Sequence, residues 1–231
     1  MLTISVTSDL EQRVSQFARI ANDQVPFATA VALTRTAKLA KQEIERQLPS
    51  LIDRPTAFTM KGFRLWPASK RSLVATVDFR QSMTGGNAAK DYLAPLVYGG
   101  VRRVKNFERA LQRSGVLPQG YAAVPGSAAK IDGFGNMSRA QLGQVLASVG
   151  AAKPKARKIT QRYFVAARGK GSLAPGVWLA EGRSVRPVLM FVKQPAYKAR
   201  LNIAGIASQV INQRFATELD AAMQQAMSSR K

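Results

Sequence analysis

Residues 56–80, TAFTMKGFRLWPASKRSLVATVDFR, decide the fold class, because the apolar pattern changes its period within them. From Ser72 to Phe79 the odd positions are all apolar and the even positions are mostly polar. This period of two is typical of a strand. Residues 58–66 are predicted as the partner strand, and 67–70 as the turn between the two. The segment therefore predicts β-structure in a chain whose N- and C-terminal parts are predicted to be helical.

Two helices are predicted on the N-terminal side of these strands. Ser8 and Glu11 have the spacing of a capping box, which starts a first helix that runs to about Ala21. Pro26 is well placed as the first residue of a second, longer helix, and Pro49 is expected to end it. One apolar stripe with spacings of three and four predicts the buried face of this second helix. The stripe consists of Ala30, Leu33, Ala37, Ala40, Ile44 and Leu48.

The rest of the chain alternates short elements with loops. Short helices are predicted at 105–114 and 138–150, and three short strands at 163–167, 177–180 and 188–192. These strands are expected to form an antiparallel meander that continues the earlier sheet. A long helix is predicted from about Ala199 onward. Its apolar stripe is Ala207, Ile211, Phe215, Leu219 and Met223.

We therefore expect an α+β fold, in which N-terminal helices and a long C-terminal helix pack on an antiparallel β-sheet. No internal repeat is found, and residues 1–231 are expected to form a single domain. Residues 81–160 are expected to be an elaborated, partly irregular basic insertion within it. Inside this loop-rich region, the large apolar residues of 115–136 are too sparse for a core of their own, so we expect neighbouring subunits to order that segment.

The composition points away from catalysis. The chain has 35 Lys and Arg residues against 13 Asp and Glu, a formal net charge of +22, and it has no His and no Cys. An excess of this size repels itself unless a polyanion or an acidic partner neutralises it. The absence of His and Cys excludes Ser–His and Cys–His nucleophile systems and removes the usual transition-metal ligands. We expect a basic binding or structural protein that is not an enzyme and needs no cofactor.

Residues 101–170 carry more than half of the charge excess, with 14 basic side chains and two acidic ones, Glu108 and Asp132. This pattern predicts contact with the phosphate backbone of duplex DNA or with acidic protein surfaces, without base-specific readout. The candidate binding residues are Arg102, Arg103, Lys105, Arg113, Lys153, Lys155, Arg157, Lys158, Arg162, Arg168 and Lys170.

The two ends of the chain resemble a known family. The segments are 17–44, FARIANDQVPFATAVALTRTAKLAKQEI, and 188–231, VLMFVKQPAYKARLNIAGIASQVINQRFATELDAAMQQAMSSRK. Both are similar to the minor tail protein Z family of lambda-like tailed phages and prophages. The resemblance implies a structural virion protein that acts in tail completion, at the neck or head-proximal end of the tail. It also implies a homo-oligomeric ring that contacts DNA leaving the capsid and adjoins connector or head-closure proteins and tail terminator or tail-tube proteins. The location implied is the virion, after assembly in the cytoplasm of the bacterial host.

Two other functions stay open at this point. The first is a non-specific nucleic-acid-binding protein that acts outside a virion, which ring assembly would distinguish from a neck protein. The second is a metal-dependent nuclease in which Asp78 and Asp91 converge, which metal-dependent cleavage would identify. No membrane partner is expected, because no stretch approaches the roughly 18 consecutive apolar residues of a spanning helix.

Overall fold

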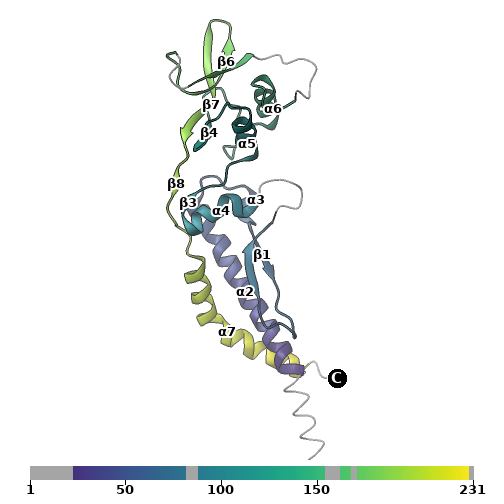
Figure 1. Ribbon diagram of the computed structural model, residues 1–231. Helices are drawn as coiled ribbons and strands as arrows, with labels where there is room; N and C mark the ends of the chain where they lie inside the picture. The colour runs from purple at the N-terminus through teal and green to yellow at the C-terminus, as the bar shows by residue number, and fades with distance from the viewer. Residues whose placement is uncertain (1–22, 82–87, 154–161, 168–170, 229–231) are drawn as a thin grey trace, which may run out of the picture. The chain divides into compact units, whose positions relative to one another are not determined.

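The computed structural model describes residues 23–81, 88–153, 162–167 and 171–228. The protein is α+β, with long N- and C-terminal helices and antiparallel sheets, as predicted (Figure 1). The predicted first helix, at 8–21, lies outside the described residues.

The chain divides into two compact units. The first unit contains residues 1–48, 60–81 and 201–231, and the second contains 49–59 and 82–200. The region expected to be an insertion, 81–160, thus groups with the strands that follow it. The expectation that all 231 residues fold as one domain stays a prediction.

In the first unit, the strands β1 (Phe63–Trp66) and β2 (Thr76–Phe79) pair antiparallel, with Phe63 opposite Phe79. Both of these side chains are buried, and their ring centroids lie 5.3 Å apart. The odd–even alternation of the sequence is thus confirmed for the four residues of β2, whose odd positions face inward.

Both strands are shorter than predicted. Residues 57–60 form the one-turn helix α3 (Ala57–Met60), and Val74 lies outside β2 with 64% of its surface exposed. Pro67 has no N–H to donate to a ladder. The backbones of Ser69 and Ser72 exchange two hydrogen bonds, of 2.9 and 3.1 Å, which close a separate tight turn. Strand pairing therefore stops at Trp66.

The long helix α2 (Val25–Leu51) confirms the second predicted helix, and Pro49 lies inside its last turn. Most of its buried residues recur at every fourth position, whereas the predicted stripe mixed spacings of three and four. Because a helix has 3.6 residues per turn, residues four positions apart are offset slightly round the axis, and a row of them turns gradually away from the predicted stripe. Leu33 and Ala37 of the predicted stripe are consequently only half-buried. The buried row is Ala28, Ala32, Thr36, Ala40, Ile44 and Leu48, with Ala30 beside it.

The predicted C-terminal helix is α7 (Ile203–Ser228). Ala222 and Ala226 pack against Ala28 and Ala32 of α2, so small side chains make the centre of this helix–helix contact. The predicted stripe was wrong at Ile211, which is half exposed. Alanines carry the contact, and they give a weak hydrophobic signal in the sequence. The larger residues packed round it are Val31, Phe215, Leu219 and Met223.

The second unit is built on a four-stranded antiparallel sheet. Its strands are β4 (Tyr121–Pro125), β5 (Arg162–Ala166), β6 (Gly176–Glu181) and β7 (Ser184–Lys193), in the spatial order β4-β7-β6-β5. The predicted meander of three strands is confirmed as β5, β6 and β7. It does not continue the sheet of the first unit: β1 and β2 form a separate two-stranded sheet, and it is β4 that pairs with β7.

Two short helices pack against this sheet. The helix α5 (Asn106–Arg113) contributes Leu111, and α6 (Arg139–Ser148) contributes Val145, to a core that includes Val177 and Leu189 of the sheet. Both helices were predicted from the sequence at these places. Gly115, with a φ of +73°, follows α5 in the left-handed conformation that ends many helices.

The remaining elements of the second unit are α4 (Ala89–Tyr98) and the short antiparallel pair β3 (Gly100–Val101) and β8 (Ala196–Tyr197). The sequence did not predict α4. Pro95 within it and the unbroken run of apolar residues at 92–98 obscure the helical period.

The structure corrects the expectation that neighbouring subunits order residues 115–136. Leu117 and Ala123 belong to the core of the unit, and Ala123 is paired with Phe191 of β7. At the end of β4, a Cβ on Gly126 would lie 2.4 Å from the carbonyl oxygen of Pro187, so only glycine fits there. The segment folds onto its own unit because alanine and glycine let it approach the sheet closely. Its exposed large residues are Val124, Ile131 and Phe134.

Candidate polyanion-binding surface

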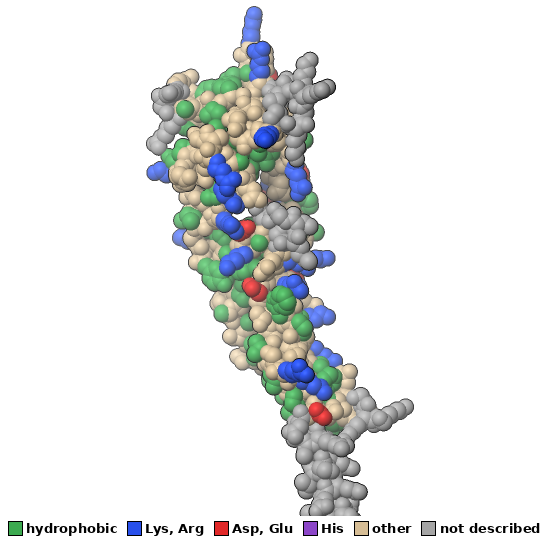
Figure 2. All heavy atoms as spheres, turned by 45° about the vertical axis from the view of Figure 1, so that its right-hand side comes forward, with side chains coloured by type: hydrophobic (Ala, Val, Ile, Leu, Met, Phe, Trp, Pro, Cys, Tyr) green, Lys and Arg blue, Asp and Glu red, His purple; other side chains and the backbone are tan. Residues whose placement is uncertain are grey.

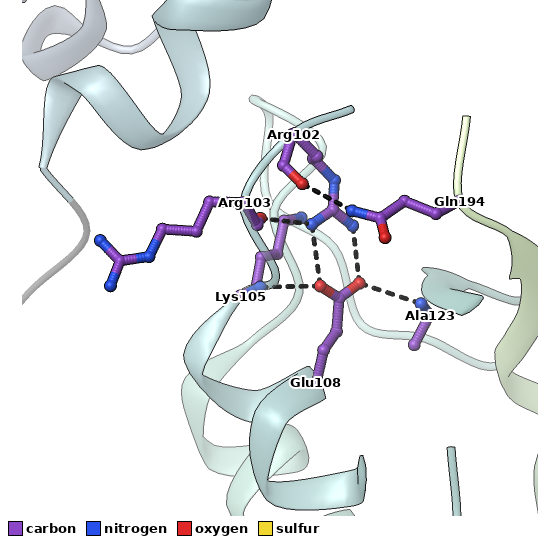
Figure 3. Close-up of polar contacts among 6 residues, drawn as sticks. All are labelled: Arg102, Arg103, Lys105, Glu108, Ala123 and Gln194. Carbon is purple, nitrogen blue, oxygen red and sulfur yellow. Dashed lines mark hydrogen bonds and ion pairs between the residues drawn. The ribbon is translucent and has the colours of Figure 1, made fainter. Parts of the chain in front are cut away.

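The first candidate binding residues lie where the chain enters α5, and a single carboxylate organises them. Glu108, in the first turn of α5, accepts a hydrogen bond of 2.8 Å from the backbone N–H of Lys105. The guanidinium of Arg102 donates to both of its carboxylate oxygens, at 2.6 and 2.8 Å. The backbone N–H of Ala123 in β4 donates a fourth hydrogen bond, of 3.0 Å (Figure 3). Glu108 thus joins three parts of the second unit.

This arrangement gives Arg102 a structural role. Its side chain is 14% exposed and that of Glu108 is 1% exposed. The hydrogen bond to Glu108 raises the pKa of the Arg102 guanidinium. Burial raises the pKa of the Glu108 carboxyl, but hydrogen bonds from Arg102, Lys105 and Ala123 outweigh it and hold this pKa below its ordinary value. The Arg102 guanidinium also donates to the Arg103 carbonyl, at 3.1 Å, and is largely buried, so it is held inside the unit and is not presented as an exposed cation.

The neighbouring cations are more accessible. Arg103 points away from Glu108 (Figure 3) and forms an ion pair of 3.0 Å with Asp91, with 64% of its own side chain exposed. An exposed pair of this kind contributes little to stability, so phosphate can replace the carboxylate at small cost. Burial, and then the positive charge of Arg102, lower the pKa of Lys105, although its side chain reaches solvent. An anion bound there would relieve the repulsion between the two cations.

Three further candidates are exposed at other places in the second unit. Arg113 lies in the last turn of α5, Lys153 follows α6, and Arg162 is the first residue of β5. None of the three forms an ion pair with a described carboxylate. The structure therefore presents them as separate exposed cations. The other candidates, Lys155, Arg157, Lys158, Arg168 and Lys170, lie outside the described residues.

The structure also adds cations that the sequence did not single out. Lys130 and Arg139 are brought together by the β-bridge between Ile131 and Met137, and both line a hollow of about 520 Å³. The carboxylate of Asp132 lies in the same wall, where it accepts hydrogen bonds from the backbone N–H groups of the loop that follows. The two cations are nine positions apart in the sequence, so neither belongs to a visible cluster there.

The two carboxylates of the nuclease hypothesis have local structural partners. Asp78 belongs to the first unit and accepts a hydrogen bond from the N–H of Phe79. Asp91 belongs to the second unit, where it accepts a hydrogen bond from Ala88 at the start of α4 and pairs with Arg103. Within the described ranges, no three acidic side chains are grouped as metal ligands would be.

No protein-family model, curated protein or solved structure matches this chain. The resemblance of its two ends to a phage tail family therefore rests on the sequence alone. In the part of the chain that the structure describes, no helix is both long and apolar enough to cross a bilayer.

Proposed function

We propose that the protein is a structural virion protein of a tailed bacteriophage. In this proposal it is a minor tail or tail-completion protein at the neck, where it forms a ring that contacts exiting DNA and adjoins connector and tail proteins. The observation that carries the proposal is the large set of exposed cations on the second unit that no described carboxylate neutralises. The resemblance of residues 17–44 and 188–231 to minor tail proteins supplies the virion context.

The electrostatic part of the argument follows from how the acidic residues are used. On the face drawn in Figure 2, Lys and Arg side chains far outnumber Asp and Glu. Most of the few carboxylates are already paired, for example Glu108, Asp91 and Glu181. The exposed cations of the second unit without an ion pair among the described residues are Lys90, Lys105, Arg113, Lys130, Arg139, Lys153, Arg162, Arg183, Lys193, Lys198 and Arg200.

Such a surface suits the sugar–phosphate backbone of duplex DNA. Each Lys or Arg that neutralises a phosphate releases condensed counterions, which gives binding without sequence preference and a strong dependence on salt. The described cations of the second unit are spread over helix ends, strand ends and loops, which suits contacts to phosphates rather than the reading of base edges. The same surface supports the alternative, a non-specific nucleic-acid-binding protein outside a virion.

Charge reversal tests the DNA contact. In fluorescence anisotropy titrations of a labelled duplex over a range of salt concentrations, the triple variant Arg113→Glu, Lys153→Glu and Arg162→Glu should bind more weakly. Its slope of log K against log salt should be smaller by about 3, since three phosphate contacts are lost.

The matched control reverses three exposed cations of the first unit, Lys38, Lys61 and Arg80, and should keep most of the affinity. Equal losses in the two triple variants would show that the net charge acts globally and that the second unit is no DNA-binding surface. If the wild-type protein binds DNA but is missing from purified particles, the alternative outside a virion replaces the neck proposal.

A further inference from the structure

The first unit contains a preformed hollow between α2 and the turn that follows β1. One face of α2 lines it with Phe27, Ala30 and Val31, and the turn contributes Pro67 and Ala68 opposite them; its volume is about 440 Å³. The hydroxyl of Thr34 holds the two sides together, because it donates to the Ala30 carbonyl at 2.8 Å and accepts from the Ala68 N–H at 3.1 Å. The hollow is thus part of the fold of this unit.

The floor of the hollow offers few polar groups to a ligand. The Thr34 hydroxyl is engaged on both sides, and the hydroxyl of Ser69 accepts a hydrogen bond from the backbone N–H of Ser72. The remaining floor is aromatic, aliphatic and proline surface. An occupant must therefore present an apolar group here, since a polar one would lose its hydrogen bonds to water.

The rim, in contrast, is cationic. Arg35 and Lys70 flank the apolar floor, and the Lys70 ammonium lies 5.6 Å from the centre of the Phe27 ring. Arg35 is partly engaged, because it donates to the side chain of Gln225 and lies 4.0 Å from Glu218. Lys70 forms no ion pair with a described carboxylate, and Arg71 adds a second exposed cation next to it.

Exposed aromatic side chains adjoin this site. Phe27 is 39% exposed and Trp66, directly before the turn, is 49% exposed. The guanidinium of Arg64 stacks over the Trp66 ring at 4.0 Å, which again places a cation on an aromatic surface. Apolar surface bordered by charged groups in this way marks interaction sites on soluble proteins.

We propose that this hollow binds an acidic segment of a partner protein, with one aromatic or large aliphatic side chain in the hollow and carboxylates on Lys70 and Arg35. Charge complementarity selects the acidic flanks, and the largely apolar floor selects the apolar anchor. A nucleobase fits less well, because most donors and acceptors on its edge would find no partner on the largely apolar floor. The site goes beyond the proposed DNA contact, which concerns the second unit.

Two fluorescein-labelled peptides test this proposal on the full-length protein. The first is Glu-Asp-Phe-Asp-Glu-amide with the label on its N-terminal amine, and the second has serine in place of phenylalanine. At 0.15 M salt, where exposed charges more than about 8 Å apart are screened, the phenylalanine peptide should bind about tenfold more tightly, as burial of one large apolar side chain predicts. Phe27→Ala should reduce this preference and leave the weak binding of the serine peptide unchanged.

Lys70→Glu and Arg71→Glu form a matched pair of variants, because they make the same charge change at adjacent exposed positions and only Lys70 lines the hollow. Lys70→Glu should weaken binding of the phenylalanine peptide several-fold more than Arg71→Glu. Equal affinities of the two peptides, or equal losses in the two variants, would overturn the proposal.

A competition experiment distinguishes an acidic protein segment from a nucleic acid as the occupant of the hollow. If a thymidine 12-mer displaces the phenylalanine peptide, and its own binding depends on Lys70 and not on Arg71, the hollow is a nucleic-acid site and the acidic-protein proposal fails. Duplex binding by Lys70→Glu should stay near the wild-type value. The proposed DNA contact is tested separately, by duplex titrations of the charge-reversal variant of the second unit.

Discussion

Glu108 shows what a strongly basic chain does with its few carboxylates. It accepts four hydrogen bonds, from the Arg102 guanidinium and from two backbone N–H groups, while almost none of its surface reaches solvent. Removing one partner of such a buried pair leaves the other charge without compensation. The residue therefore ties α5 to β4 and keeps Arg102 away from the binding surface.

We expect Glu108→Gln to lower the free energy of unfolding by about 3–5 kcal/mol, because the buried Arg102 charge loses its counterion. Urea denaturation followed by circular dichroism measures this. Glu181→Gln is the control, because Glu181 pairs with Arg186 on the surface and such pairs contribute about 0–1 kcal/mol. Equal losses in both variants would contradict the structural role assigned to Glu108.

The same residue gives a dependence on pH. In the folded protein the pKa of Glu108 lies below its ordinary value. Its contribution to stability is therefore complete above the unfolded-state pKa of about 4.3 and is lost as the pH falls through the folded-state pKa. The difference in unfolding free energy between wild type and Glu108→Gln should shrink as the pH drops below that unfolded-state value. A difference that stays constant through that range would count against the pairing.

Among the elements, the contact between α2 and α7 depends on alanine. Ala28 and Ala32 face Ala222 and Ala226, all almost completely buried, so the two backbones approach closely and little room remains between them. Overpacking such a contact forces side chains or backbones apart. This explains how a helix with only three charged residues and many small ones holds its place in the first unit.

Ala222→Leu should destabilise the protein by about 1–3 kcal/mol, because the added carbons have no space in the α2–α7 contact. The neighbouring Ala221 is exposed, so Ala221→Leu, the same change one position earlier, should be nearly silent. Thermal or urea unfolding of the two variants checks this pair. If Ala221→Leu proved as damaging as Ala222→Leu, the face that α7 presents to α2 would have to be reassigned.

At the scale of the whole molecule, the charge excess limits how copies can come together. Each chain carries +22, so association needs either surfaces with little charge or an anion between the copies. The helix α7 carries only Arg214, Glu218 and Asp220 as charged residues, in contrast to the basic loops and strand ends of the second unit. A ring whose copies meet through surfaces with little charge, such as that of α7, depends little on attraction between charges. We therefore expect the proposed ring to tolerate higher salt than the DNA contact does.

Mass photometry of the purified protein tests the ring. We expect one closed oligomer whose mass is an integer multiple of 25.1 kDa and which persists or grows in population as salt is raised, because repulsion between copies is screened. DNA binding should weaken over the same range of salt. A protein that stays monomeric at every salt concentration would favour the alternative, a non-specific nucleic-acid-binding protein.

The sequence by itself determined the fold class, the meander of β5 to β7 and the helices α2, α5, α6 and α7. These elements carry a regular apolar period over enough residues to be recognised from local spacing. The charge excess of residues 101–170 was equally visible, because composition does not depend on the fold. The strand β4 escaped prediction, since Ala122 and Ala123 give almost no period-two signal.

Only the tertiary structure decided which cations face solvent. Arg102 and Lys105 look alike in the sequence, yet Arg102 is held by Glu108, and the Arg102 carbonyl accepts a hydrogen bond from Gln194, 92 positions away. The hollow beside Phe27 likewise depends on Ala68, whose N–H reaches the Thr34 hydroxyl of another element. Such contacts join residues distant in the chain, and local periodicity carries no information about them. The composition therefore predicted a polyanion-binding protein, and the packing determined which residues its surfaces offer.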